Sequence, residues 1–372
     1  MRLDNIQQVF FALVKAGLWE QDARLLPYGK VDYEKIMCLA EEQSVIGLVT
    51  AGFEHVVDVK VPTEEVLQFV GQSLQIEQQN TAMDSYIAEL VEKMQAAGIY
   101  TLLVKGQGIA QCYERPLWRS CGDVDLFLSE DNYNKAVKFL TPLASDIEQE
   151  YKYNKHQAMT IDSWVVELHG NLRCGLSSKI DGVLDKIKRD TFYGGNVRSW
   201  INGKTTVFLL SVDSDIIYVF THILNHFYKG GIGLRQVCDW CRLLFYYREK
   251  LDLRVLESRI RKMGLMSEWK AFGTFAVEYL GMPTEAMPLY SPGTKWKRKA
   301  DKICSFIMEV GNFGQNRDMS YYSRYPYLVR KLISMGHRCG DLIRHARIFP
   351  LDSLRFFPYM MYNGMREAVR GR

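Results

Sequence analysis

The stretch GDVDLFL, residues 122–128, decides the fold of this 372-residue chain. Side chains on a β-strand alternate between the two faces of a sheet, so Asp123 and Asp125 share one face while Val124 and Leu126 lie on the other. Two carboxylates held a few ångströms apart repel each other unless a cation compensates them, and a divalent ion bound by carboxylate oxygens does so directly. The stretch therefore predicts a strand that carries a metal site.

The same acid-x-acid spacing occurs again at Asp213 and Asp215, which provides a control within the chain. This second pair opens a predicted helix, where acids are favoured in the first turn by capping and by the helix dipole. The first pair instead begins an apolar strand and follows an earlier strand that ends in Lys105. Context, rather than spacing alone, makes Asp123 and Asp125 the metal candidates.

A third acid comes from WVVELHG, residues 164–170. In a strand, Glu167 and His169 share one face, opposite Val166 and Leu168. A third carboxylate beside a strand with two acids is the usual requirement for holding two Mg²⁺ ions in phosphoryl chemistry. Glu167 is therefore the third predicted ligand, while His169 either orients it, contacts a substrate or has a structural role.

Phosphate binding is predicted at Lys105-Gly106-Gln107-Gly108, which follows a strand and opens a short helix. Glycine lets the backbone approach a phosphate, and a helix N-terminus offers unpaired N–H groups. The alternative is a plain tight turn. Arg119, in the loop before the acidic strand, could bind phosphate with both arms of its guanidinium or be a surface arginine.

The chain divides into three predicted segments. Residues 1–98 show apolar positions every three or four residues, as in helices, and residues 211–372 return to that pattern with a basic, aromatic tail. Residues 99–210 form an α/β core. Its predicted strands are 100–104, 123–128, 147–153, 156–161, 164–169 and 205–208, with helices at 108–113 and 132–140. We expect a mixed α+β fold with a sheet flanked by helices.

Composition and charge limit the class of protein. A hydrophobic fraction of 47% with 24% charged residues is that of a folded globular chain rather than a disordered one. The net charge of +4 mildly favours an anionic partner without distinguishing nucleic acid, nucleotide or membrane surface.

The cysteines and the apolar runs indicate a cytoplasmic protein. The eight cysteines lack the spacing of a disulfide framework, which suits a reducing compartment. Cys238 and Cys241 form one CxxC inside a helical pattern, and no second pair completes a four-ligand zinc set. The N-terminus carries Asp4 where a secretion signal is basic, and no apolar run reaches the roughly 20 residues that span a bilayer.

Taken together, VKGQGIAQCYERPLWRSCGDVDLFL and the later VVELH resemble the uncharacterised nucleotidyltransferase family of the DNA polymerase β superfamily. The resemblance covers about residues 95–245. It implies a nucleotidyltransferase-like mixed sheet and assigns site roles to Lys105, Gly106, Arg119, Gly122, Asp123, Asp125, Glu167 and His169; Gly108 joins this set through the glycine turn. The usual Gly-Ser of the superfamily's phosphate loop is replaced here by Lys105-Gly106. The segment HILNHFYKGGIGLRQVCDW resembles the family's helical part and would implicate His222, Arg235 and Asp239.

Simpler interpretations stand beside some of these residues. His222 and His226, four apart on a helix, suit the edge of a metal site, but packing in a core or cleft is favoured. Arg235 and Asp239 are one helical turn apart and most simply form an intrahelical ion pair. The tail from Ser320 onward has ten Lys or Arg residues against three acids and could bind RNA, although amphipathic helices with solvated arginines are favoured.

The predicted function is a metal-dependent nucleotidyltransferase that moves an NMP group from an NTP to an acceptor by two-metal catalysis with Mg²⁺ or Mn²⁺. The acceptor is a protein, an RNA or a small molecule. One alternative is a non-catalytic nucleotide-binding or regulatory module of the same fold. Another is a glycosyltransferase with a D-x-D metal site, which requires a larger parallel sheet before the acids than this sequence provides.

Overall fold

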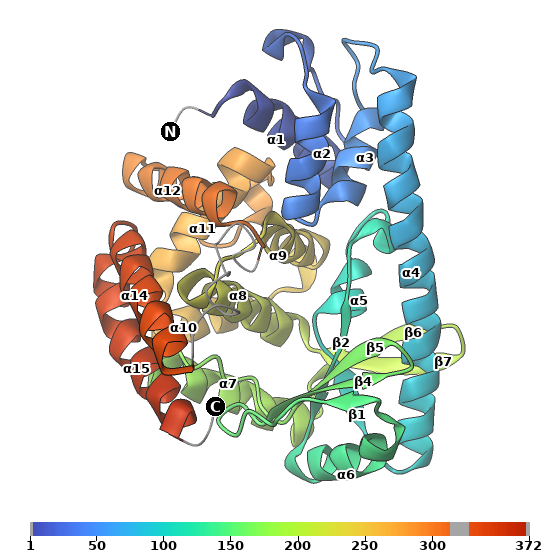
Figure 1. Cartoon of the computed structure of the whole chain (residues 1–372), viewed down its shortest axis with the longest axis vertical. Coiled ribbons are helices and arrows are strands. Elements are labelled where there is room, and N and C mark those ends of the chain that lie inside the picture. Colours follow the sequence, from blue (N-terminus) through green and yellow to red (C-terminus); the bar gives the residue numbers. More distant parts are fainter. Residues whose placement is uncertain (1–2, 313–326, 370–372) are drawn as a thin grey trace.

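The computed structural model describes residues 3–312 and 327–369. The chain opens with helices α1 (Asn5–Trp19), α2 (Tyr33–Glu42), α3 (Ile46–Glu54) and α4 (Thr63–Ala96). A capping box begins α1, because the Asp4 carboxylate accepts the backbone N–H of Gln7 at 2.8 Å and the Gln7 side chain accepts that of Asp4 at 3.4 Å. At 34 residues, α4 continues beyond the other three helices and runs along the sheet (Figure 1).

One mixed sheet forms the centre of the α/β core. Its strands are β1 (Thr101–Leu103), β2 (Asp123–Leu128), β3 (Asp146–Ile147), β4 (His156–Ile161), β5 (Trp164–His169), β6 (Val197–Asn202) and β7 (Thr205–Leu210), in the order β3-β4-β5-β2-β1-β7-β6. Strand β2 is parallel to β5 and antiparallel to β1, and β1 is parallel to β7. The acidic strand therefore lies at the middle of the sheet, where both of its edges are hydrogen-bonded.

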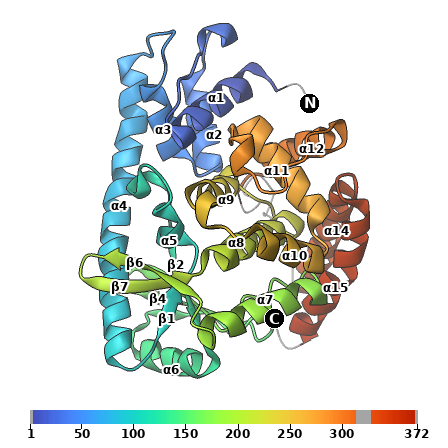
Figure 2. The same ribbon diagram turned by 180° about the vertical axis from the view of Figure 1, so that it is seen from behind.

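Helices cover both faces of the sheet and form most of the described chain after it. The core contributes α5 (Gly106–Ala110), α6 (Glu130–Leu140) and α7 (Ser178–Phe192). Within the described residues, the helices that follow the sheet are α8 (Val212–Lys229), α9 (Leu234–Tyr246), α10 (Leu253–Met263), α11 (Met266–Leu280), α12 (Thr294–Val310), α14 (Tyr327–Ala346) and α15 (Pro350–Val369). In both views α14 and α15 lie on the side of the molecule opposite α4, with α8 and α9 between them (Figures 1 and 2).

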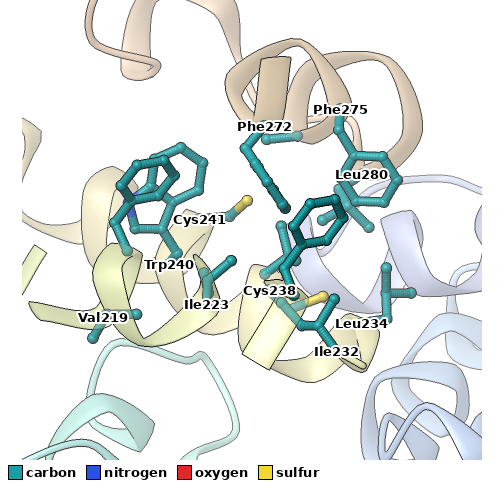
Figure 3. Close-up of a cluster of buried hydrophobic side chains, with 14 of the residues drawn as sticks. Val219, Ile223, Ile232, Leu234, Cys238, Trp240, Cys241, Phe272, Phe275 and Leu280 are labelled. Atoms are coloured by element: carbon teal, nitrogen blue, oxygen red, sulfur yellow. The ribbon is translucent and has the colours of Figure 1, made fainter. Parts of the chain in front are cut away.

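The buried apolar side chains form two clusters that meet at the sheet. In the smaller cluster, Val124, Leu126 and Leu128 of β2 pack with the second half of α4 and with α6. The larger cluster joins the first helices to α7–α12 and α15. Its centre is formed by α8, α9 and α11, where Trp240, Phe272 and their neighbours are fully buried (Figure 3). On the opposite face of β2 the two acids are followed by Phe127, which is fully buried in the larger cluster.

The predicted fold class is confirmed: the chain is a mixed α+β protein with a seven-stranded sheet flanked by helices. The strands predicted at 123–128, 156–161 and 164–169 have the observed bounds. The strand predicted at 147–153 is wrong in length, because only Asp146–Ile147 pairs with β4, apart from an isolated bridge at Tyr151. Sequence analysis did not predict α7 or β6; β6 pairs with β7 through a two-residue turn in which Gly203 has a φ of +60°.

The tail and the cysteines are described in part. The basic tail begins outside the described residues, at 320–326, and from residue 327 onward its described part forms α14 and α15, as the amphipathic interpretation predicts. Cys238 and Cys241 are buried and free, and neither belongs to a group of potential metal ligands in the described ranges. Within those same ranges, no helix combines the length and the apolar character needed to cross a bilayer.

Candidate active site

Strand register brings the predicted acids together. In the parallel pair of β2 and β5, Asp125 lies directly opposite Glu167, and Asp123 lies opposite Val165. Because side chains alternate, Asp123, Asp125 and Glu167 all project from the same face of the sheet. Carboxylate oxygens of the three residues lie within 4.8 Å of one another. The structure thus places the three predicted metal ligands in one cluster.

Lys105 and His169 hold this cluster. The Nζ atom of Lys105 and the Nε2 atom of His169 each lie 2.7 Å from Oδ1 of Asp125, which is only 2% exposed. Lys105 reaches this position from the turn after β1, where its own φ is +58° and that of Gly106 is +41°. A left-handed conformation at a non-glycine residue is strained, and such strain gathers at functional sites.

The charges in the cluster shift each other's pKa values. The charge of Asp125, followed by burial, raises the pKa of Asp123. Burial alone would lower the pKa of Lys105, but the nearby charges, above all that of Asp125, raise it above its ordinary value. Likewise, burial opposes protonation of His169, while hydrogen bonds to Asp125 and Glu167 raise its pKa. The three acids therefore lie in mutual repulsion that Lys105 and His169 relieve in part.

Glu167 is kept ionised by histidines. Burial favours its neutral form, yet hydrogen bonds with His156 and His169 hold its pKa well below the ordinary range. The Nε2 atom of His156 lies 3.0 Å from Oε2 of Glu167, and that of His169 lies 3.5 Å from the same oxygen. A carboxylate that stays charged at all physiological pH values suits a metal ligand.

Two cavities border Asp123. The larger, about 280 Å³, lies between the sheet and α8 and is lined by Lys105, Glu167 and His169 together with His222, Asn225 and His226. The smaller, about 50 Å³, lies between Asp123, Lys105 and α9, and Arg235 of α9 lines it. The acids are thus reached from two sides, one rich in histidine and amide groups and the other cationic.

Comparison with known proteins identifies the family of this chain. The sequence model of a family described as "Uncharacterised nucleotidyltransferase" matches residues 29–281, more than half of the chain. The chain belongs to this family. A crystal structure of an antigenic nucleotidyltransferase-like protein from Paracoccidioides brasiliensis is similar to 50% of this chain and 90% of its own, at 13% identity and a TM-score of 0.30. Among curated proteins, no sequence matches.

The three glycines of the predicted site lie in different surroundings. Gly106 lies over the acidic strand, where an added Cβ would sit 3.3 Å from Sγ of Cys121 and 3.6 Å from the carbonyl of Asp123. At Gly108 a Cβ would lie 2.8 Å from a methyl group of Leu209, so this glycine packs α5 closely against β7. Gly122 is exposed and has open space around its Cα. Only Gly106 lines a cavity that also contains the acids.

Arg119 is engaged by an acid from α9. Its Nε and Nη2 atoms each lie 2.8 Å from an oxygen of Asp239, and the hydroxyl of Tyr113 donates to the same carboxylate at 2.8 Å. The intrahelical pair predicted between Arg235 and Asp239 is therefore wrong, because the planar guanidinium of Arg119 binds both oxygens at once. Burial opposes ionisation of Asp239, but Arg119 lowers its pKa. Arg119 lies in the wall of the smaller cavity.

Arg235 is better placed than Arg119 to contact a ligand. Its Nη1 atom donates to the carbonyl of Ser120 at 2.6 Å, and its buried Nε has no hydrogen-bond partner among the described residues. An unpaired buried donor is unfavourable and marks a place where a ligand oxygen fits. The position of Arg235 after the glycine-rich turn was the sequence signal for this role. The expected ion pair with Asp239 gave the residue a structural explanation instead.

His222 and His226 form part of the cavity wall. Their Nε2 atoms are 3.0 Å apart, and neither belongs to a group of potential metal ligands among the described residues. Burial lowers the pKa of His222 well below its ordinary value and that of His226 to about 4, so both imidazoles are neutral at physiological pH. Cleft packing, the favoured interpretation, describes their position.

Sequence analysis missed three polar residues around the larger cavity. His156 faces His169 across the β4–β5 pair. Asn154 and Asn225 also line the cavity, and each has a buried amide oxygen without a partner in the described ranges. The hairpin spacing could have identified His156, since the predicted strands are separated by two residues and pairing across such a turn places 156 opposite 169.

Proposed function

We propose that this protein transfers an NMP group from an NTP to an acceptor, with release of pyrophosphate. The observation that supports this reaction is the convergence of Asp123, Asp125 and Glu167 from two parallel strands beside two cavities. The family assignment supports nucleotidyl transfer in general. The acidic cluster supports the metal-dependent form of it.

The donor set fits Mg²⁺ or Mn²⁺. These ions prefer oxygen ligands, and the three carboxylates supply them within 4.8 Å of one another. The charge of Asp125, followed by burial, raises the pKa of Asp123, and a bound cation would relieve this repulsion. Divalent ions bound here would stabilise charge on the transferring phosphate and increase the acidity of an acceptor hydroxyl.

The residues around the acids have complementary roles in the proposal. Lys105, which pairs with Asp125, and Arg235, whose Nε lacks a partner in the described residues, would neutralise the triphosphate from the smaller cavity. Arg119 remains a predicted phosphate contact. It lies in the wall of the smaller cavity, where Asp239 fixes its guanidinium. Gly106 would let the backbone approach a phosphate, and His169 holds the oxygens of Asp125 and Glu167 in place.

The larger cavity is the proposed acceptor side. The free amide oxygens of Asn154 and Asn225 accept hydrogen bonds from hydroxyl or amine groups, and the neutral imidazoles of His222 and His226 add no charge. A cavity of about 280 Å³ admits a small molecule, a side chain or the end of a nucleic acid. A glycosyltransferase is disfavoured, because β1, the one strand that precedes the acidic strand in the sheet, runs antiparallel to it.

The test determines which phosphate of a labelled NTP is transferred to an acceptor. The protein is incubated with cell extract, Mg²⁺ or Mn²⁺ and each NTP labelled at the α- or the γ-phosphate, and labelled protein, RNA and small molecules are separated. The proposal is supported by two results together. Wild type and the Asp213→Asn control transfer the α-label and not the γ-label, and Asp123→Asn transfers neither label. Transfer of the γ-label, or equal α-labelling by Asp123→Asn, contradicts it. Nucleotide binding without any transfer would indicate the non-catalytic module.

A further inference from the structure

A second group of potential metal ligands adjoins the carboxylates. Nitrogen atoms of His156 and His169 and an oxygen of Glu167 lie within 4.8 Å of one another. We propose that these three residues form a distinct metal site, which binds a divalent transition-metal ion such as Zn²⁺ beside the carboxylate cluster. The proposal does not depend on nucleotidyl transfer.

The backbone register places the three side chains on one face. In the antiparallel pair of β4 and β5, His156 lies directly opposite His169, and Ala158 lies opposite Glu167. Glu167 and His169 are two residues apart on β5 and therefore project in the same direction. Directly opposed residues in a sheet bring their side chains into contact, and the two imidazole ring centroids are 4.8 Å apart. The group is thus built on strands rather than on loops.

The spacing of the donor atoms matches a tetrahedral ion. Metal–ligand bonds of about 2.0–2.1 Å in a tetrahedron separate neighbouring donors by about 3.3 Å. The distance from Nε2 of His156 to Oε2 of Glu167 is 3.0 Å, and the distance from Nε2 of His169 to the same oxygen is 3.5 Å. These two separations are close to that value, and all three donors lie within 4.8 Å of one another.

The donor chemistry distinguishes this site from the carboxylate cluster. Imidazole nitrogen favours Zn²⁺ and related transition metals, whereas a set of carboxylate oxygens suits Mg²⁺, Ca²⁺ or Mn²⁺. Two histidines and one glutamate also leave a tetrahedral ion one open position, as catalytic zinc sites do. That position faces the larger cavity, which all three residues line and where the amide oxygen of Asn154 lacks a partner among the described residues. The open position can take water or an oxygen of a substrate.

Glu167 belongs to both groups and His169 contacts both, so His156 is the residue that separates them. A bound ion would take the place of the hydrogen that His169 shares with Oδ1 of Asp125, and Lys105 keeps that oxygen paired at 2.7 Å. His156 bonds to Glu167 and is absent from the carboxylate group. A change at His156 therefore removes one nitrogen ligand while the three carboxylates remain.

Cobalt is the probe for this site. Metal-free protein is titrated with Co²⁺ in an excess of Mg²⁺, which occupies oxygen-only sites, and the visible absorption bands of tetrahedral Co²⁺ are recorded. Wild type should bind one Co²⁺ with such bands, and Asp123→Asn should do the same. His156→Ala should weaken Co²⁺ binding by at least about 100-fold, because even changes beyond the ligands reduce metal affinity by 10- to 100-fold.

Unchanged bands in His156→Ala, or their loss in Asp123→Asn with retention in His156→Ala, would overturn the inference. Circular dichroism and thermal melting show whether the alanine variant is folded. Should it fail to fold, His156→Cys gives the result, since a cysteine at this position must add the charge-transfer band of a Co²⁺-bound thiolate, and a missing band would overturn the site. Co²⁺ absorption does not involve a nucleotide, so a failure of the transferase proposal is separately visible.

Discussion

Two acid-x-acid pairs with the same spacing lie in different surroundings in this molecule. On β2, a period of two residues puts Asp123 and Asp125 on one face, and both join Glu167. On α8, residues two apart are rotated by about 200° around the axis. There, Asp215 is buried with its Oδ2 2.5 Å from Nη2 of Arg198, while Asp213 accepts the backbone N–H of Asp252 at 3.0 Å.

The two pairs also differ in what shifts the pKa values of their carboxylates. The pKa of Asp123 is raised first by the charge of Asp125, whereas that of Asp215 is raised by burial and opposed by Arg198. Repulsion between neighbouring acids favours binding of a cation, and an acid that already has a buried arginine does not. Secondary structure, more than the motif, therefore decides whether such a pair can hold a metal.

The largest expected effect is on catalysis by Asp123→Asn. Removing this ligand should reduce nucleotidyl transfer by roughly 100- to 1,000-fold or more, as loss of one electrostatic contact to a transition state does. The melting temperature of the metal-free protein should not fall, because repulsion with Asp125 is relieved. Transfer kinetics and calorimetry measure both quantities. A destabilised variant with full activity would mean that Asp123 is structural.

The reverse pattern is expected for Asp215→Ala. This change leaves Arg198, whose side chain is 13% exposed, without its carboxylate. Breaking a buried ion pair in this way costs about 3–5 kcal/mol of unfolding free energy. Urea denaturation measures this loss, while the activity of the folded fraction should equal that of wild type. A loss of activity without a loss of stability would remove the distinction between the two pairs.

A smaller, pH-dependent effect on the free energy of unfolding is expected for Glu268, a buried acid that belongs to neither pair. Burial, with a further contribution from Asp352, raises its pKa to about 8. The folded state therefore holds this proton at pH values where the unfolded state has lost it, so stability falls as pH rises from about 4.5 to 8. Glu268→Gln should flatten this part of the stability profile relative to wild type. Identical profiles for both proteins would show that Glu268 ionises normally.

The smallest effect is expected for Asp213→Asn. Asp213 is partly exposed and its carboxylate accepts a hydrogen bond from the backbone of Asp252, so the unfolding free energy should change by no more than about 0.5 kcal/mol. Transfer activity and metal affinity should match wild type. Because this variant makes the same chemical change as Asp123→Asn, any loss of metal binding in it would point to a general charge effect.

Local patterns were sufficient to predict the strands of the site. Apolar alternation in residues 122–128 and 164–169 fixed both their bounds and the face on which Asp123, Asp125 and Glu167 lie. The order of the strands did not follow from such patterns, because β2 pairs with β5 across two intervening strands. That step came from the expectation that a third carboxylate lies beside a strand with two acids, and in the structure Asp125 lies opposite Glu167.

Tertiary pairings were the part that local patterns could not give. Arg119 and Asp239 are 120 residues apart, and a helical spacing of four favoured the nearer Arg235 instead. The β4–β5 turn at Asp162 and Ser163 has positive φ at both residues without the glycine that usually marks such turns, so its register, and with it His156, was overlooked. Helix α7 was missed although Ser177 caps it and apolar residues recur along one side.

Metal-dependent nucleotide binding tests the central claim most directly. Isothermal titration calorimetry with a non-hydrolysable NTP analogue, with and without Mn²⁺, compares wild type, Asp123→Asn and Asp213→Asn. We predict that Mn²⁺ strengthens binding of the analogue to wild type and to Asp213→Asn, and has no effect on binding to Asp123→Asn. Equal strengthening by Mn²⁺ in all three proteins would contradict a metal site built on Asp123, Asp125 and Glu167.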